Sequence, residues 1–276
     1  MLIEKTKLLI AKNWLIKAIL VVCFLCAVLF VGKHLYMIIQ HDIPELNEGI
    51  IGTLLGAIVG GVFTLLGSII INKNVQKAQN AIKRKGIIYK PLYDELKNIH
   101  ERILIDNPYP NNVSFEKEIQ SYIPIPQYTV WGRIKNDSRY FEVPKKLRDE
   151  MEKLYKTIET YQDEYSKTCY TFDRFYREEH KKINDLPLPE DASYGGSLLR
   201  FVIDDSTREY RRPMWFDKEL TDEQIRCFWN SCYSRAVDCI DYKRLKEAKN
   251  KWRSSEDKVL SLLSIYIEYI IVKYEG

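Results

Sequence analysis

The chain has 276 residues with 42 Lys or Arg and 38 Asp or Glu, which gives a formal net charge of +4. Charges so nearly balanced provide no concentrated basic face, so we expect no nucleic-acid partner. The apolar runs lie before residue 72, and the rest is long enough to bury its own core, which predicts a membrane part followed by a folded domain.

The N-terminal part of the chain predicts a first transmembrane helix. A basic stretch, residues 1–14, precedes this helix at about 15–39, where residues 18–32 form an uninterrupted apolar run. A cleaved signal peptide is the alternative for this segment. No small-x-small cleavage pattern follows the apolar run, so we predict a retained helix with a cytoplasmic N-terminus.

The clearest membrane signal is the stretch 50–71, whose 22 residues are all uncharged. As a helix rising about 1.5 Å per residue it spans about 33 Å, close to the roughly 30 Å of a bilayer's hydrocarbon core. The link 41–49 carries acids but no Lys or Arg, whereas both outer flanks are basic. The positive-inside rule therefore predicts a transmembrane hairpin, residues 15–71, with both chain ends in the cytoplasm.

Small residues recur every four positions in the second predicted helix and form two adjacent rows, which we call the glycine rows. The rows consist of Gly52, Gly56, Gly60 and Thr64, and of Gly49, Thr53, Ala57 and Gly61. Small residues let helices approach closely in lipid, where packing drives association. They predict contact with the first helix of the same chain or between chains, and we favour a homo-oligomer.

Residues 72–105 are predicted to form juxtamembrane helices. The first should continue from the membrane to a cap at Gly86, and Pro91 suits the first turn of the next. Five basic residues follow the apolar stretch: Lys73, Lys77, Lys83, Arg84 and Lys85. Each is worth about 1 kcal/mol of attraction near anionic headgroups, so we assign them to the lipid bilayer.

Residues 106–276 predict a helical cytoplasmic domain. Prolines indicate an irregular connection over 106–126, and residues 128–141 suit a short helix or a strand. From Pro144, apolar residues at alternating spacings of four and three predict a helix of about thirty-five residues. Its coiled-coil-like seam fits an intramolecular hairpin or an intermolecular coiled coil. We favour the hairpin, because the seam is rich in aromatic residues.

The remaining elements complete an all-α membrane protein: an N-terminal two-helix transmembrane hairpin plus a mainly helical cytoplasmic domain. Residues 185–197 suggest a linker or exposed loop, and Thr221 with Gln224 predicts a capping box that starts a core helix. Residues 259–272 are too short and too interrupted to span a bilayer, and predict a buried terminal helix.

Sequence patterns for catalysis are lacking. Cys23 and Cys26 lie in the first apolar run without a second pair at zinc-site spacing, and His100 and His180, expected at the surface, have no neighbouring nucleophile. We expect no enzyme activity, no metal and no cofactor. One polar group, Arg208, Arg211 and Arg212, is suited to bind a phosphate or a partner's carboxylates, although a solvated loop is the simpler interpretation.

Four stretches carry a resemblance: Ile-Tyr-Lys-Pro-Leu-Tyr-Asp-Glu-Leu at 88–96, Tyr-Thr-Val-Trp at 128–131, Val-Pro-Lys-Lys-Leu at 143–147, and 154–161. Over about residues 50–165 the chain resembles a family of largely uncharacterised bacterial two-transmembrane-helix proteins. The resemblance implies a bacterial cytoplasmic (inner) membrane protein and supplies no active site. Such proteins often lie near anti-phage defence systems, which implies an effector that perturbs the membrane.

Two hypotheses about function follow. The first is a membrane-anchored effector that oligomerises and perturbs the membrane after a cytoplasmic trigger, with a role in anti-phage defence. The alternative is a membrane-anchored scaffold whose helical domain binds a soluble partner protein. A membrane-tethered hydrolase ranks last, because the sequence offers no arrangement of a nucleophile with a base.

Overall fold

The computed structural model describes residues 30, 32–34, 37, 48–115, 124–184, 188–204, 210, 213 and 219–276. These residues are helical between short connections, and their one β pairing is an isolated bridge between Ser114 and Gln127. The chain divides into two compact units, Met1–Gln79 and Asn80–Gly276. The first predicted transmembrane helix and the acidic link fall almost entirely outside the described residues, so the two-helix hairpin stays a prediction.

The uncharged stretch 50–71 lies in helix α2, Glu48–Arg84, which has 37 residues. The helical run to which α2 belongs is the one in the described residues that is long and apolar enough to cross a membrane, and none of its apolar window is buried. Ile58, Leu65 and Ile71 keep 56%, 64% and 65% of their surface exposed. A long apolar helix that the described residues do not cover needs another apolar environment.

The helical run continues beyond Gly86, so the predicted cap at that glycine is wrong. Two π-helical turns, η1 (Lys85–Tyr89) and η2 (Ile99–Ile103), alternate with α3 (Lys90–Asn98) and α4 (Leu104–Asp106). Pro91 starts α3 as predicted. It has no N–H for the carbonyl of Ile87 four residues earlier, and Arg139 Nη1 donates to that carbonyl at 3.2 Å. The proline's missing hydrogen bond is thereby replaced, and the helix continues.

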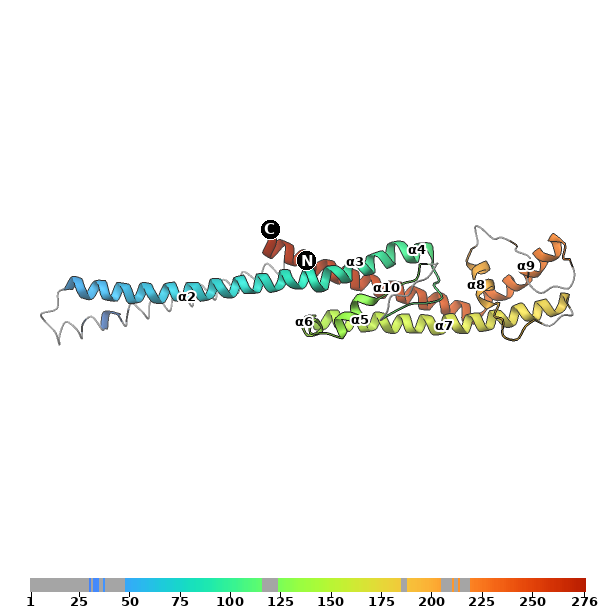
Figure 1. Cartoon of the computed structure of the whole chain (residues 1–276), viewed down its shortest axis with the longest axis horizontal. Helices are drawn as coiled ribbons and strands as arrows, with labels where there is room; N and C mark the ends of the chain where they lie inside the picture. Colours follow the sequence, from blue (N-terminus) through green and yellow to red (C-terminus); the bar gives the residue numbers. More distant parts are fainter. Residues whose placement is uncertain are drawn as a thin grey trace. The chain divides into compact units, whose positions relative to one another are not determined.

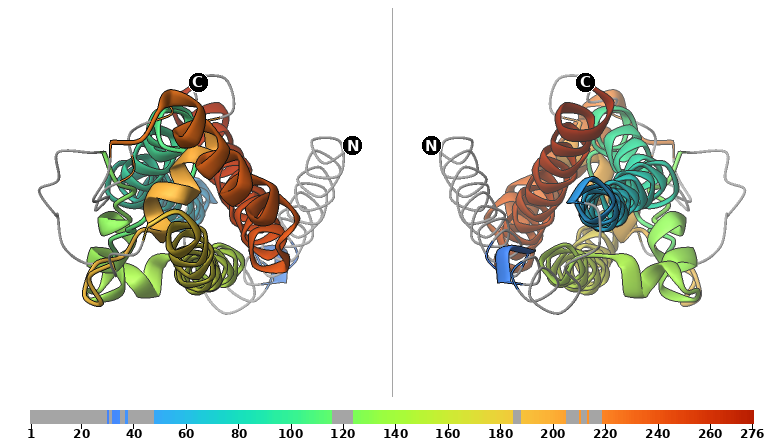
Figure 2. Two further views of the ribbon diagram at one scale, coloured as in Figure 1. Left: turned by 90° about the vertical axis from the view of Figure 1, so that its right-hand side faces the viewer. Right: turned by 90° about the vertical axis from the view of Figure 1, so that its left-hand side faces the viewer.

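The second unit is built on two long helices, α7 (Lys145–Ile183) and α10 (Ile240–Ile270). α10 lies beside α7 and also contacts α3 and η1 (Figures 1 and 2). The short helices α5 (Thr129–Lys135) and α6 (Arg139–Glu142) lie near the start of α7, and α8 (Gly195–Ile203) and α9 (Asp222–Asp238) cover its second half (Figure 1). The chain ends in a third π-helical turn, η3 (Ile271–Glu275).

The predicted apolar stripe of α7 forms the centre of the core. Five of its residues have no exposed surface: Leu147, Met151, Leu154, Ile158 and Tyr161. α7 extends to 39 residues, and its principal neighbour is α10 of the same chain. α10 therefore fills the seam of α7 within the same chain. For residues 128–141, which suited a short helix or a strand, the structure has the helices α5 and α6.

Other predictions at the C-terminal end have mixed outcomes. The capping box of Thr221 and Gln224 is confirmed at the start of α9. The predicted terminal helix is present, but it is buried on one face alone: Leu263 has no exposed surface, whereas Val272 is 79% exposed. The prediction of a loop over 185–197 is wrong for its last three residues, because α8 begins at the buried Gly195.

Gly195 marks a close approach between α8 and α7. A Cβ built on this glycine would lie 1.8 Å from the carbonyl oxygen of Cys169, a backbone atom of α7 that cannot move aside alone. At the neighbouring Gly196 the same test finds nothing within 4 Å. Gly195 is therefore required for contact between the two helices, while Gly196 is not.

We expect Gly195→Ala to lower the free energy of unfolding by about 3 kcal/mol, because overpacking forces α8 away from α7. Gly196→Ala is the matched control and should be neutral or slightly stabilising, since alanine favours a helix. Urea unfolding of the full chain in detergent micelles, followed by tryptophan fluorescence, measures both. Equal stability of the two variants would contradict this account of the α7–α8 contact.

Candidate functional site

The glycine rows lie on α2 with their surfaces open. Built Cβ atoms on Gly52, Gly56, Gly60 and Gly61 meet nothing within 4 Å, and Thr53 and Ala57 are exposed. Thr64 donates to the carbonyl of Gly60 at 2.8 Å, so its hydroxyl is satisfied inside the helix. Gly49 also lies in α2. The rows thus offer a surface on which a second helix backbone can approach closely.

The five basic residues assigned to lipid headgroups fall into two groups. Lys73, Lys77 and Lys83 are exposed on α2. Arg84 Nε lies 3.1 Å from Glu142 Oε2, and Lys85 pairs with Glu275 near the C-terminus. Both pairs belong to the second unit, and partly exposed pairs of this kind contribute about 0–1 kcal/mol. The first three lysines are therefore the group best placed for lipid headgroups.

The predicted arginine patch, Arg208, Arg211 and Arg212, lies outside the described residues and stays a prediction. Its neighbour Tyr210 is described: the hydroxyl donates to Asn230 Oδ1 of α9 at 3.2 Å, and the ring packs edge-on against Phe201 of α8. Tyr210 thus packs against the α8–α9 end of the second unit.

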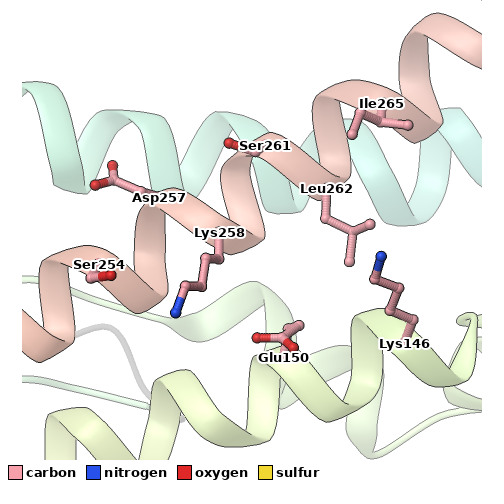
Figure 3. Close-up of a pocket in the computed structure, with 8 residues that line it drawn as sticks. All are labelled: Lys146, Glu150, Ser254, Asp257, Lys258, Ser261, Leu262 and Ile265. Atoms are coloured by element: carbon pink, nitrogen blue, oxygen red, sulfur yellow. The ribbon is translucent and has the colours of Figure 1, made fainter. Parts of the chain in front are cut away.

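Grooves in the second unit offer little chemistry. One groove, of about 410 Å³, lies between α7 and α10 (Figure 3). Its lining consists of Lys146, Glu150, Ser254, Asp257, Lys258, Ser261, Leu262 and Ile265. Lys146 and Lys258 extend into the gap from opposite helices, with Glu150 between them (Figure 3). It holds no histidine or cysteine, and the described residues contain no group of three His, Cys, Asp or Glu suited to a metal.

The most distinctive chemistry of the second unit is a buried hydrogen-bonded group around Glu256, which we call the Glu256 cluster: His100, Tyr128, Trp252, Glu256 and Asp257. Glu256 of α10 has no exposed surface. Its Oε1 accepts a hydrogen bond from the Tyr128 hydroxyl at 2.8 Å, and Trp252 Nε1 donates to that hydroxyl at 2.8 Å. On the other side, His100 Nδ1 of η2 lies 3.1 Å from Glu256 Oε2.

His100 connects this buried carboxylate to the surface. Its Nε2 lies 3.4 Å from Oδ1 of Asp257, whose side chain is 60% exposed, whereas the His100 side chain is 25% exposed. Burial raises the pKa of Glu256, and the hydrogen bonds from Tyr128 and His100 partly offset that rise. Removing one partner of a buried charge typically costs about 3–5 kcal/mol, so each contact matters to the folded state.

Glu95 of α3 binds the residues that follow Tyr128 at the start of α5. Its Oε2 accepts hydrogen bonds from the N–H and hydroxyl of Thr129 and from the N–H of Val130, each at 3.0 Å. This carboxylate therefore caps the N-terminus of α5, where its charge also suits the helix dipole. Tyr155 of α7 donates to the carbonyl of Tyr128 at 2.9 Å. The start of α5 is thus fixed by α3, α7 and α10 together.

The sequence did not reveal this arrangement. The prediction that both histidines lie at the surface is wrong: His100 reaches the buried Glu256, and His180 is 2% exposed. One signal was available. Glu256 lies on the apolar face of α10, four residues after Trp252 and three before Val259, where a carboxylate needs a buried partner.

Comparisons with known proteins give no match: no family model, no curated protein sequence and no solved structure is significantly similar to the chain. The resemblance over residues 50–165 therefore stays a prediction. The residues that carry it have structural roles here, since Ile88, Leu92 and Leu96 are fully buried and Glu95 caps α5.

The Glu256 carboxyl should make stability depend on pH. Because its folded-state pKa lies above the ordinary value of 4.5, its contribution is fully present below the unfolded pKa and is lost as the pH rises through the folded pKa. Glu256→Gln keeps an acceptor for Tyr128 and removes the titration. We therefore expect the stability of this variant relative to the parent to increase as the pH rises above the ordinary carboxyl pKa of 4.5.

Urea unfolding of both proteins across this pH range measures that difference. Glu159→Gln, at an exposed position of α7, is the control and should show a difference that does not change with pH. A pH-independent difference for Glu256→Gln would contradict the raised pKa.

Proposed function

We propose that this protein is a membrane-anchored effector that self-associates through α2 and perturbs the membrane after a trigger reaches its helical second unit. The observation that carries the proposal is the surface of α2. Seven large apolar residues between positions 58 and 71 are exposed: Ile58, Val62, Leu65, Leu66, Ile69, Ile70 and Ile71. Burying each is worth about 1.5–3 kcal/mol, so water is an unfavourable environment for this helix and lipid a favourable one.

The glycine rows support self-association. Their open surfaces allow another helix to approach the α2 backbone, and packing of this kind drives helix association in lipid. Residues advance about 100° around a helix, so the rows share one side of α2 while Ile58 and Val62 lie on the other side. One side can then contact a second chain while the other faces lipid.

The uninterrupted helical run supports the link between trigger and membrane. It contains α2, η1, α3, η2 and α4 without a non-helical residue. A helix transmits rotation and displacement along its length, so a change in the second unit has a direct route to α2. The charge pattern adds cytoplasmic termini to the proposal. The resemblance adds the bacterial inner membrane and an anti-phage role.

The proposal predicts that bulky residues in the glycine rows abolish the membrane effect. Cells that express the parent should depolarise under phage challenge, whereas cells with Gly56→Leu/Gly60→Leu should keep their potential, because the added side chains separate the helices. A voltage-sensitive dye measures the response. The control, Ile58→Leu/Val62→Leu, changes the opposite side of the same helix and should behave like the parent.

A membrane-anchored scaffold is the second candidate, and one observation favours it. The outer face of the C-terminal segment exposes Ile265, Tyr269 and Val272, which recur at helical spacing. Such a face suits a soluble partner protein. An unchanged membrane potential for the parent in every condition would reject the effector and leave the scaffold.

The predicted topology has a separate test. A fluorescent protein fused to the C-terminus should be fluorescent, and alkaline phosphatase inserted in the link 41–49 should be active, because it works only outside the cytoplasm. Active phosphatase fused at the C-terminus would reverse the proposed orientation.

A further inference from the structure

We propose that the Glu256 cluster is a latch that holds η2 against α10 in the resting protein, and that its release starts the membrane response. The inference rests on the proposed function for its output, and on the contacts of His100 for its mechanism. It assigns to His100 the role of a positioning residue whose contact with Glu256 keeps the protein inactive.

The two sides of Glu256 are held unequally. Tyr128 is fully buried, its carbonyl accepts from Tyr155, and the next residue is fixed by Glu95. His100 is partly exposed and connects to Glu256 from η2 alone. An opening of the cluster therefore separates His100 from Glu256 and leaves the Tyr128 side in place.

Asp257 gives the released histidine a second partner. Its carboxylate already lies 3.4 Å from His100 Nε2 and is largely exposed to solvent. Breaking the contact with Glu256 thus leaves His100 paired with Asp257 alone. Glu256 keeps the Tyr128 hydrogen bond. The resting state pairs His100 with both acids, and the released state would pair it with Asp257 alone, so the two states that a switch requires differ in one contact.

The local helix geometry can convert this release into movement. η2 is a π-helical turn, which contains one residue more than an α-helical turn. If it relaxes to α-helical geometry, the helix on one side rotates by about 100° relative to the other. The contact between His100 and Glu256 fixes this turn against α10. η1 and α3 lie between this turn and α2 and pack against α10, so the relaxation reaches α2 when these two elements shift with it.

Hydrogen exchange of the full chain in detergent micelles tests the latch itself. In His100→Ala the backbone amides of η2 and α4 should exchange about tenfold faster or more, because a hydrogen bond to a buried charged group is lost. Amides in the centre of α7 should keep their rates. Glu101→Ala, at the exposed next position of η2, is the matched control and should match the parent.

Membrane potential tests the output. Cells that express His100→Ala should depolarise without phage challenge. Adding Gly56→Leu/Gly60→Leu to this variant should restore the potential, because release then lacks an assembling α2. The parent and Glu101→Ala should depolarise only when challenged.

The outcomes separate the latch from the proposed function. Unchanged exchange in η2 of His100→Ala overturns the latch, whatever the parent does to the membrane. Faster exchange without spontaneous depolarisation, in cells where the challenged parent depolarises, overturns the switch and leaves the proposed function intact. No depolarisation by any protein rejects the proposed function, and with it the output assigned to the latch. If the α7 amides also accelerate, His100→Ala is unfolding, and His100→Leu, which fills the space without a donor, replaces it. The η2 amides of His100→Leu should then exchange faster than the parent's, while its α7 amides should keep their rates. If His100→Leu matches the parent in both η2 exchange and membrane potential, the latch is overturned.

Discussion

A fully buried carboxylate must find its hydrogen bonds inside the protein, and the second unit is organised around this requirement. Glu256 brings the start of α5, the indole of Trp252 and the η2 turn to one point on α10. Glu95 repeats the principle from α3, where it satisfies the first amides of α5. The short, irregular middle of the chain, whose Tyr128, Trp131 and Ile134 are fully buried, is thus also positioned by two acids, one on α3 and one on α10.

A second constraint acts on α2, whose apolar surface is exposed instead of buried. The core helices hide their apolar stripes against one another, whereas α2 leaves its apolar surface uncovered by any described residue. The two units therefore satisfy the hydrophobic effect in different ways: one by folding on itself, the other through whatever surrounds it. The glycine rows matter for this reason, because a helix that no described residue covers can pack against another helix.

Local periodicity explains what the sequence predicted well. The stripe of α7, the capping box of α9 and the uncharged stretch of α2 depend on residues within a few turns of one another. The failures involve distant partners. Glu256 meets Tyr128 and His100 at separations of 128 and 156 residues. The helix passes Pro91 while Arg139 donates to the carbonyl of Ile87 the hydrogen bond that the proline cannot. The buried Gly195 likewise depends on the backbone of Cys169 in another helix. No window along the sequence contains such pairs.

The ion pair between Lys85 and Glu275 joins the first residues of the second unit to its last ones. A unit whose ends meet behaves as a closed module: it can be inserted into a loop of a host protein with little strain at the junctions. The same geometry means that a mechanical load applied between α2 and the C-terminus enters and leaves at neighbouring points. Such a load would strain this pair first and would bypass the α8–α9 end altogether.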